Sequence, residues 1–462
     1  MKIIIVGAGR VGSTLAHNLA SEANDITVID QDVSLLHELQ ERLDIQTIHG
    51  FGAHPGVLKK AGGEYADMVI AVTGSDETNM VACQVCYTLF HTPTKIARVR
   101  AAEYLNDPNT RDTLFVNDSI PIDMIISPEQ LVTDHIRKLI KYPGALQVLD
   151  FADGKVRLVG VKAFYGGPLV GHELRDIRKH MPKIDSRIAA IYRRGRGLIP
   201  EGNTIIEADD EIFFLAARKD IRKVMAEVRR VDKPARHIMI AGGGNIGLRL
   251  AKALERNNHV KLLEQRRARI SYLNDLLDRT LVLHGDAANE ELLLEENIQH
   301  VDVFCAVTND DEANILSAML AKRLGAKRVM ALINRPAYVD LVQGESVIDI
   351  AVSPQQTTIG ALLSHVRRGD VATVHALRQG AAEAIEAVAH GTPETSKVVG
   401  RVVEDVPLPA GATISAIVRG DAVMMAHHDT LIEAEDHVIV FLTDKTKTTE
   451  VEKLFEVAPS YL

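Results

Sequence analysis

The sequence predicts an α/β protein made of two tandem Rossmann-like, doubly wound parallel-sheet domains, each followed by a small α+β domain. Three observations predict this fold. A glycine fingerprint occurs twice, as GAGRVG at 7–12 and as GGGNIG at 242–247. Each copy joins a β-branched run to a helical pattern. The two halves of the chain also stay similar far beyond the fingerprints.

The internal repeat places Gly7 on Gly242. AVTGSDETN at 71–79 falls on AVTNDDEAN at 306–314, and IDMIISPEQ at 122–130 falls on IDIAVSPQQ at 348–356. A unit of about 230 residues is longer than a solenoid repeat, so it indicates a duplicated two-part module. We expect Rossmann-like domains at 1–123 and 233–349, and small domains at 143–227 and 368–453.

Strand and helix patterns alternate in the first part of each copy. In the first copy KIIIVGAG is a strand that leads into the helical pattern VGSTLAHNLA, and DITVID, DMVIAV and KIARVR are later strands. HIMIAG, HVKLLE, VDVFCAV and RVMALI take the same places in the second copy. This alternation favours a parallel sheet with right-handed crossovers.

The small domains share a pattern of strand, glycine turn, strand, acidic turn, strand. It is read in RIAAIYRRGRGLIPEGNTIIEADDEIFFLA and in TISAIVRGDAVMMAHHDTLIEAEDHVIVFL. The acidic turns either bind a divalent cation or, as is more common for such runs, are solvated. Their residues are Glu207, Asp209, Asp210, Glu433, Glu435 and Asp436.

The segment PEQLVTDHIRKLIK between the first two domains predicts an amphipathic helix. Such a stripe is typical of a crossover or dimerisation helix, and we expect helix exchange between subunits. The apolar stripe consists of Leu131, Val132, His135, Ile136, Leu139 and Ile140.

Composition excludes several classes of protein. The formal net charge of −9 argues against a nucleic-acid binder. No apolar run approaches the roughly 18 residues of a membrane span, so we expect a soluble protein. The chain's 3 cysteines do not form a secreted disulfide framework, which favours the cytoplasm. Cys83 and Cys86 form a C-x-x-C, either a redox or metal pair or two core positions one helical turn apart; with no second pair to complete a zinc site, we favour the core.

The first fingerprint has the spacing of a dinucleotide site. Gly7 permits the tight turn, Gly9 lets the backbone approach a pyrophosphate, and Gly12 lets the helix pack closely. Asp30 ends the second strand about 20 residues on, where a carboxylate accepts hydrogen bonds from ribose hydroxyls and repels a 2′-phosphate. The combination favours NAD or another adenosine nucleotide over NADP.

Polar residues at later strand ends complete this pocket. Thr73 and Gly74 follow the fourth strand, where a doubly wound sheet exposes its carboxyl ends to ligand. They also fit ordinary N-capping of the next helix, with Asp76 close by. Arg98 ends the next strand and is placed to reach a phosphate.

The second copy repeats the constellation with differences. Glu264 ends its second strand, and Arg266 and Arg267 follow; these arginines either meet a phosphate or, as we favour, solvate the start of the next helix. Leu332 or a near neighbour takes the place of Arg98, so the two sites are expected to differ at this contact. The remaining predicted residues of this copy are Gly242, Gly244, Gly247, Thr308 and Asn309, with Asp311 beside them.

Catalytic groups are missing from the pattern. None of the 9 tyrosines precedes a lysine by four residues, as a short-chain reductase requires. His49 and His284 occupy matched positions, at which we expect turn residues beside the pocket rather than catalytic groups. An NAD-dependent oxidoreductase and a nucleotide-responsive transcription regulator remain as alternatives to a regulatory protein that is not an enzyme.

The arrangement GAGRVG…VID…AVTGSDETNM…RVR, repeated as GGGNIG…LLE…AVTNDDEAN…ALINR, resembles the TrkA family, the cytoplasmic regulatory subunits of bacterial Trk potassium uptake systems. The resemblance covers essentially the whole chain. It implies two RCK modules, binding of NAD(H) and possibly ATP or ADP, a homotetramer, and peripheral association with the inner face of the membrane through a TrkH-type potassium-translocating subunit. By resemblance the first nucleotide site comprises Gly7, Ala8, Gly9, Arg10, Val11, Gly12, Asp30, Thr73, Gly74 and Arg98. The second comprises Gly242, Gly243, Gly244, Asn245, Ile246, Gly247, Glu264, Thr308 and Asn309.

Overall fold

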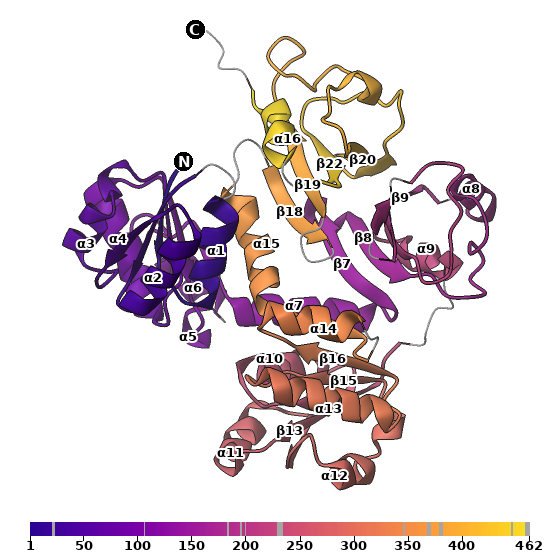
Figure 1. Ribbon diagram of the computed structural model, residues 1–462, viewed down its shortest axis with the longest axis horizontal. Coiled ribbons are helices and arrows are strands. Elements are labelled where there is room, and N and C mark those ends of the chain that lie inside the picture. Colours follow the sequence, from indigo (N-terminus) through magenta and orange to yellow (C-terminus); the bar gives the residue numbers. More distant parts are fainter. Residues whose placement is uncertain are drawn as a thin grey trace. The chain divides into compact units, whose positions relative to one another are not determined.

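The structure is a computed structural model (Figure 1). It describes residues 1–20, 24–105, 107–182, 184–194, 196–198, 200–228, 234–344, 347–366, 371–377, 382–444 and 447–457. The chain forms two compact units, one of residues 1–132 with 354–362 and the other of 133–353 with 363–462.

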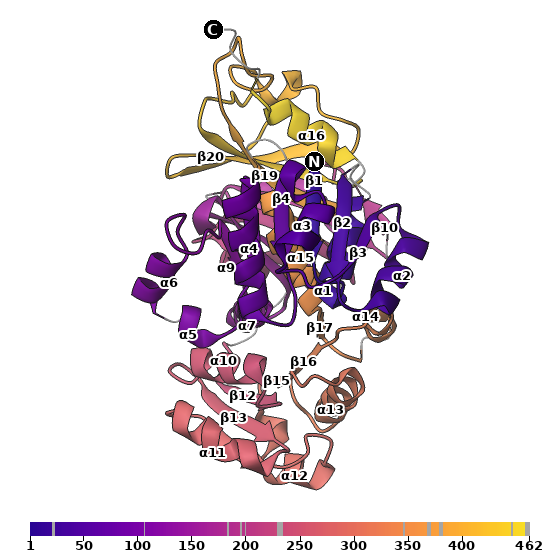
Figure 2. The ribbon, with the colours of Figure 1, turned by 90° about the vertical axis from the view of Figure 1, so that its left-hand side faces the viewer.

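The first unit contains a parallel sheet with strand order β3-β2-β1-β4-β5-β6. This is the doubly wound order: successive strands are added outward from β1 to β3, and the order then reverses, with β4 to β6 added on the other side of β1. Figure 2 shows helices on both faces of these strands. The strands are β1 (Lys2–Val6), β2 (Asp25–Asp30), β3 (Gln46–His49), β4 (Met68–Ala71), β5 (Thr94–Arg98) and β6 (Met124–Ile126). The helices are α1 (Arg10–Ala20), α2 (Val33–Arg42), α3 (Pro55–Lys60), α4 (Asp76–Phe90), α5 (Ala102–Leu105) and α6 (Pro108–Leu114). The next helix, α7 (Pro128–Lys141), belongs to this unit up to Val132.

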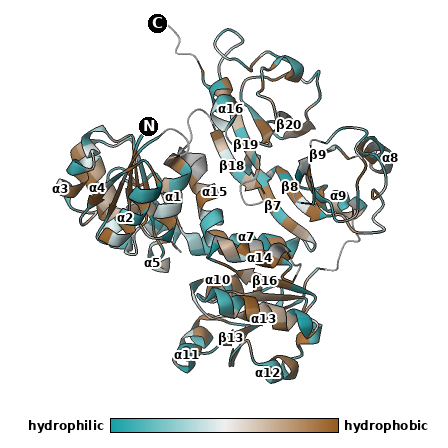
Figure 3. Ribbon diagram, in the orientation of Figure 1, coloured by the Kyte–Doolittle hydropathy of each residue, from teal (hydrophilic) through white to brown (hydrophobic). Residues whose placement is uncertain are grey.

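The second unit contains a matching sheet of order β14-β13-β12-β15-β16-β17. Figure 3 shows hydrophobic colour along the strands, while the covering helices mix both colours, as amphipathic helices do. The strands are β12 (His237–Ala241), β13 (His259–Glu264), β14 (Leu281–His284), β15 (Val303–Ala306), β16 (Arg328–Leu332) and β17 (Ile350–Val352). The helices are α10 (Asn245–Leu254), α11 (Arg267–Leu276), α12 (Glu290–Glu295), α13 (Asp311–Arg323) and α14 (Pro336–Gly344). The next helix, α15 (Pro354–Val366), belongs to the first unit up to Leu362.

Two antiparallel sheets complete the second unit, in orders β10-β9-β11-β8-β7 and β18-β19-β22-β20-β21. The predicted three-strand pattern is confirmed in both, and each sheet gains a preceding hairpin that the sequence analysis missed. The first domain has β7 (Ala145–Phe151), β8 (Val156–Lys162), α8 (Ile177–His180), β9 (Ser186–Arg193), β10 (Arg196–Leu198), β11 (Glu211–Ala217) and α9 (Ile221–Val228). The second has β18 (Val371–Leu377), β19 (Ala382–Ala389), β20 (Ala412–Arg419), β21 (Ala422–Met425), β22 (Asp436–Leu442) and α16 (Thr448–Phe455). Short 3-10 turns lie at Gly63–Tyr65, Ala152–Gly154, Leu174–Asp176, Ile298–His300 and Val403–Asp405.

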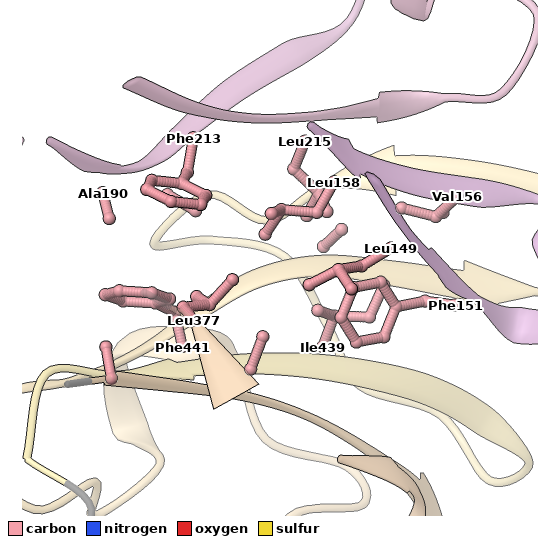
Figure 4. Packing of buried hydrophobic residues seen from close by; sticks show 14 of the residues in the cluster. Leu149, Phe151, Val156, Leu158, Ala190, Phe213, Leu215, Leu377, Ile439 and Phe441 are labelled. Carbon is pink, nitrogen blue, oxygen red and sulfur yellow. The ribbon is translucent and has the colours of Figure 1, made fainter. Parts of the chain in front are cut away.

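These two antiparallel sheets belong to the small domain that follows each Rossmann-like domain, called here the C-terminal domain of its module. The two sheets pack face to face through one hydrophobic cluster (Figure 4). Phe213 and Phe151 come from the first sheet, and Phe441 and Leu377 from the second. All four are nearly fully buried. Because apolar burial is the main stabilising contribution to folding, the two halves of the duplication share a core here.

The boundary between the units runs through α7 and α15. Residues of α7 up to Val132 belong to the first unit and the rest to the second, while α15 belongs to the first unit up to Leu362. Each of these two helices is therefore divided between the two units. Val132, Ile136, Leu139 and Ile140 are buried as the stripe predicts. Exchange of helix α7 between subunits stays a prediction.

Candidate functional site

The first glycine of each fingerprint has a backbone that only glycine adopts easily. Gly7 has φ +111° and Gly242 has φ +107°. A Cβ at Gly7 would also lie 3.1 Å from the backbone nitrogen of Thr73. These glycines therefore let the chain turn from strand to helix close to the end of the fourth strand.

The other glycines divide into a packed and an open position. A Cβ at Gly12 would lie 1.8 Å from the carbonyl oxygen of Gly7, and one at Gly247 would lie 1.9 Å from that of Gly242. At Gly9 and Gly244 nothing lies within 4 Å of a built Cβ. The middle glycine faces open space, as approach of a ligand to the loop requires.

The remaining loop residues occupy the starts of α1 and α10. Arg10 and Asn245 are exposed first residues of these helices, and Val11 and Ile246 follow them. Ala8 and Gly243 are buried, and a Cβ at Gly243 would lie 2.5 Å from Cδ1 of Leu273. The N–H groups of each helix start lie next to the open glycine, an arrangement that favours anions.

The acid at the end of each second strand holds the glycine loop. Asp30 accepts hydrogen bonds from the N–H of Ala8 at 2.5 Å and of Asp32 at 2.9 Å. Glu264 accepts from the N–H of Gly243 at 3.0 Å and of Arg266 at 2.8 Å. The sequence pattern predicts a ribose-binding role for Asp30, and the structure adds this bond to the glycine loop for both acids.

Threonines at the ends of the fourth strands are held by an asparagine that sequence reasoning missed. The N–H and hydroxyl of Thr73 donate to Oδ1 of Asn79 at 2.9 and 2.7 Å, and Nδ2 of Asn79 donates to the carbonyl of Arg98 at 2.9 Å. Thr308, Asn314 and Leu332 repeat all three bonds at 2.9, 2.7 and 2.9 Å. The sequence signal that could have revealed these asparagines is the D-E-x-N pattern that both repeats share. The matched bonds also show that Leu332 is the counterpart of Arg98.

The N-capping considered for Thr73 with Gly74, and for their counterparts Thr308 and Asn309, is made by neighbouring residues. The N-caps of α4 and α13 are Ser75 and Asp310. Asp76 is buried and accepts from the N–H groups of Arg100 and Ala101 at 2.8 Å. Asp311 accepts in the same way from Asn334 and Arg335. These carboxylates therefore fix the chain after β5 and β16. At the cap loops, Gly74 accepts from Arg100 through its carbonyl and has open space at its Cα, while Asn309 lies at the matched position.

Arg98 is a half-buried cation at the end of β5. Its guanidinium lies 3.5 Å from Glu129, and burial lowers the pKa of Arg98. Within the described part of the chain, its buried Nε has no hydrogen-bond partner. A donor of this kind fits an anionic ligand group at the strand ends.

The second site places arginines at the start of α11. Nε of Arg269 donates to the carbonyl of Gly243 at 2.6 Å, and Nε of Arg266 lies 3.4 Å from Glu264. In the first site Asp32 caps α2 instead, accepting from Ser34 and Leu35. Arg266 is 71% exposed and Arg267 begins α11, in agreement with solvation of the helix start. Arg269 was missed by the sequence analysis.

The other candidate groups have structural places. His49 and His284 end β3 and β14, in register with Asp30 and Glu264. Cys83 and Cys86 are buried in α4, and burial raises the pKa of Cys86 to about 12. No group of three or more potential metal ligands occurs among the described residues.

The acidic turns are ordered by arginine rather than simply solvated. Asp210, 1% exposed, receives two bonds of 2.8 Å from Arg193. Asp436 receives the same from Arg419. The preference for solvated turns was therefore wrong for these two carboxylates, because the sequence did not show that each arginine folds back onto its turn.

Comparison with known proteins gives the family. A model of the TrkA-N domain matches residues 3–128 and 238–354, and one of the TrkA-C domain matches 158–229 and 392–455. The chain is 61% identical to the Trk system potassium uptake protein TrkA of Halomonas elongata and 59% identical to that of Vibrio alginolyticus, in each case over 100% of both chains. The chain belongs to the TrkA family. This membership also confirms that it is a regulatory protein and not an enzyme.

Solved structures support the fold. The GsuK RCK domain covers 98% of this chain and 94% of its own, with 19% identity and a TM-score of 0.60. The GsuK channel bound to NAD covers 98% of this chain and 78% of its own, with 19% identity and a TM-score of 0.61. The predicted α/β architecture of paired Rossmann-like and small domains is confirmed. No helix in the described ranges is long and apolar enough to cross a membrane.

Proposed function

We propose that this TrkA-family protein is the regulatory subunit of a Trk-type potassium uptake system. It binds NAD(H) or adenine nucleotides and gates potassium transport through a TrkH-type membrane subunit. The potassium uptake proteins of Halomonas elongata and Vibrio alginolyticus, which match along the whole chain, support the transport role. In this proposal the protein is a homotetramer on the cytoplasmic face of the membrane and binds no nucleic acid.

The arrangement around the first glycine loop carries the nucleotide proposal. The open face of Gly9 leaves room for a pyrophosphate beside the start of α1. Asp30 lies at the end of β2, where a ribose is recognised. Thr73 and Gly74 follow the end of β4, on the other side of the glycine loop. Arg98 supplies a buried donor without a partner among the described residues. The GsuK channel, which shares the fold, has been solved with NAD bound.

The second glycine loop takes a nucleotide of its own in this proposal. Gly242, Gly244 and Gly247 repeat the loop geometry, and Glu264 repeats the acid. Arg266 and Arg269 replace the acidic cap of the first site, while Leu332 replaces Arg98. Since the charges around the loops differ, the two sites differ in ligand preference.

Gating follows from unequal affinity. A nucleotide shifts the arrangement of the domains only if it binds one arrangement more tightly than the other. The shared helices α7 and α15 and the shared core of the C-terminal sheets join the two halves of the chain, so a change at either loop is transmitted along the chain.

The test is calorimetry with NADH and ATP, followed by potassium flux in vesicles that contain the transporter. Gly9→Val and Gly244→Val close the loops without a clash, because each position faces open space. Gly56→Val is the matched control, since Gly56 is also open but lies in α3, away from both loops. We expect each loop variant to lose one nucleotide and its effect on flux. Nucleotide-sensitive flux in the double variant would overturn the proposal.

A further inference from the structure

A cavity of about 860 Å³ lies in the second unit, away from both glycine loops. It is bordered by the end of α7, by the first C-terminal domain, and by the β20–β21 turn of the second C-terminal domain. Its volume falls within the range of about 300–1,000 Å³ that is typical of sites for small ligands. No residue of either predicted nucleotide site lines it.

The cavity is lined by more positive than negative charge, although the whole chain carries −9. Its acids are Asp185, Asp220 and Asp421. Two of them are engaged: Asp421 pairs with Nζ of Lys155 at 3.0 Å, and Asp185 accepts from the N–H of Met425 at 2.8 Å. The lining cations are Lys141, Lys155, Arg218, Lys219 and Arg222.

Several of these cations have no acid to neutralise them. Within the described ranges, the side chains of Lys141, Arg218 and Lys219 have no ion pair or hydrogen bond. Arg222 lies over the ring of the buried Tyr142 at 5.5 Å and donates to the carbonyl of Lys141 at 3.3 Å. The turn that carries Arg218 and Lys219 ends with the lining acid Asp220, which immediately precedes α9. The N-terminal end of α9 adds positive potential.

At two of these positions the second copy of the module has no cation among the residues that the structure describes. Asp210 and Asp436 occupy matched acidic turns, and in that register Arg218 corresponds to Asp444 and Arg222 to Thr448. Thr448 is buried and donates to Glu383 at 2.8 Å. The two arginines of the cavity are therefore not repeated in the second copy, although Lys219 corresponds to Lys445.

We propose that this cavity is a third ligand site, which binds a small soluble anion carrying two or more phosphate groups. Clustered Arg and Lys side chains beside a helix start recognise phosphate oxygens through charge-assisted hydrogen bonds. The cavity also borders two C-terminal domains and the end of α7, whose carbonyl at Leu139 accepts from Arg328 of β16 at 3.2 Å. An anion bound here favours the arrangement in which these segments stay together.

The probe is inorganic pyrophosphate, titrated by calorimetry at low salt into the full chain carrying Gly9→Val and Gly244→Val. Both glycine loops are then blocked, so the result does not depend on the proposed nucleotide sites. We expect one pyrophosphate per chain, with affinity that falls as salt rises. Arg218→Gln with Lys219→Gln should weaken binding at least tenfold, while Lys223→Gln, an exposed neighbour in α9 outside the cavity lining, should leave it unchanged.

Asp421→Asn provides a test in the opposite direction. It removes the ion pair of Lys155, whose Nζ keeps its hydrogen bond to the carbonyl of Gly420, and it removes one negative charge, so binding should tighten several-fold. Absence of pyrophosphate binding, or equal affinity of the Arg218→Gln/Lys219→Gln and Lys223→Gln proteins, would overturn the proposal. Association with vesicles of anionic phospholipid in the absence of pyrophosphate binding would also overturn it, in favour of a membrane surface contact. Loss of nucleotide binding at the glycine loops is scored separately, in the wild-type background.

Discussion

The carboxylate of Glu386 accepts a hydrogen bond of 2.9 Å from the backbone N–H of Ala152, although the two residues belong to different C-terminal domains. Glu386 is 2% exposed, and its other oxygen lies 2.6 Å from Nδ1 of His437. Ala152 holds a left-handed φ of +48° that presents its N–H to the neighbouring sheet. This hydrogen bond links the two C-terminal domains beside their shared apolar core.

Replacing this carboxylate should destabilise the contact between the C-terminal domains. Glu386→Ala leaves the buried N–H of Ala152 without its acceptor, which costs about 1–3 kcal/mol. We expect a lower midpoint in urea or thermal denaturation. Glu404→Ala, which removes an exposed glutamate of the same domain, is the control. Equal midpoints for the two variants would show that this hydrogen bond contributes nothing.

Two histidines make the stability of the second unit sensitive to acid. Burial, with smaller effects of Lys138 and His375, lowers the pKa of His135 to about 4, and burial also lowers the pKa of His375. Each group binds a proton in the unfolded chain near its ordinary pKa of about 6.5 but resists it in the fold. Stability is therefore complete above pH 6.5 and is lost as the pH falls towards 4.

The matching experiment follows the denaturation midpoint from pH 7.5 to 4.5. His135 contributes at most about 3 kcal/mol over this window. His135→Gln should flatten the dependence, since its side chain stays neutral at every pH. His428→Gln, at an exposed position, should keep the wild-type slope. A slope unaffected by His135→Gln would assign the acid sensitivity to other groups.

The repeated fingerprint separates positions needed for folding from those needed for binding. Gly12→Ala places a Cβ 1.8 Å from the backbone oxygen of Gly7, a clash that no side-chain rotation relieves. We expect the free energy of unfolding to fall by about 1–3 kcal/mol. Gly9 immediately precedes α1 and faces open space, so Gly9→Ala should fold normally. Thermal melts that order the two variants the other way would contradict this division.

Both Rossmann-like sheets could be predicted because their signals are local: a β-branched run, a glycine turn and an acid at a fixed distance. The polar networks that complete the sites could not. Asn79 bonds across two strands to Arg98, 19 residues away, and only the folded sheet brings them together. Asp30 was predicted as a ribose ligand, but its bond to Ala8 depends on the approach of two loops. The β7–β8 hairpin was missed because its burial against the other module breaks the polar and apolar alternation expected of a two-faced sheet.

The three thiols should be inert in the native protein. Cys83, Cys86 and Cys305 are buried, and burial raises the pKa of both Cys86 and Cys305 to about 12. Since only the thiolate reacts, an aromatic disulfide reagent should label them slowly at pH 8 and rapidly in urea. Cys83→Ser and Cys86→Ser should leave nucleotide binding intact. Rapid native labelling, or loss of a bound metal from either variant, would restore the redox or metal interpretation of the C-x-x-C.

Arg98 should distinguish the two nucleotide sites. Its buried Nε awaits an acceptor, whereas Leu332 at the matched position offers none. Arg98→Met keeps the length and apolar stem of the side chain but removes its charge, so NADH binding at the first loop should weaken by about 1.5–3 kcal/mol, roughly ten- to a hundredfold. Binding at the second loop should not change.

Because Arg98 also neighbours Glu129 at 3.5 Å, Arg98→Met combined with Glu129→Gln separates loss of the ion pair from loss of the ligand contact. Arg98→Lys should recover part of the affinity, and Arg111→Met, an exposed arginine of α6, should have no effect. Wild-type NADH affinity in Arg98→Met, measured with the second loop closed by Gly244→Val, would remove Arg98 from the site and leave the difference between the two loops to the acidic and basic helix starts that follow Asp30 and Glu264.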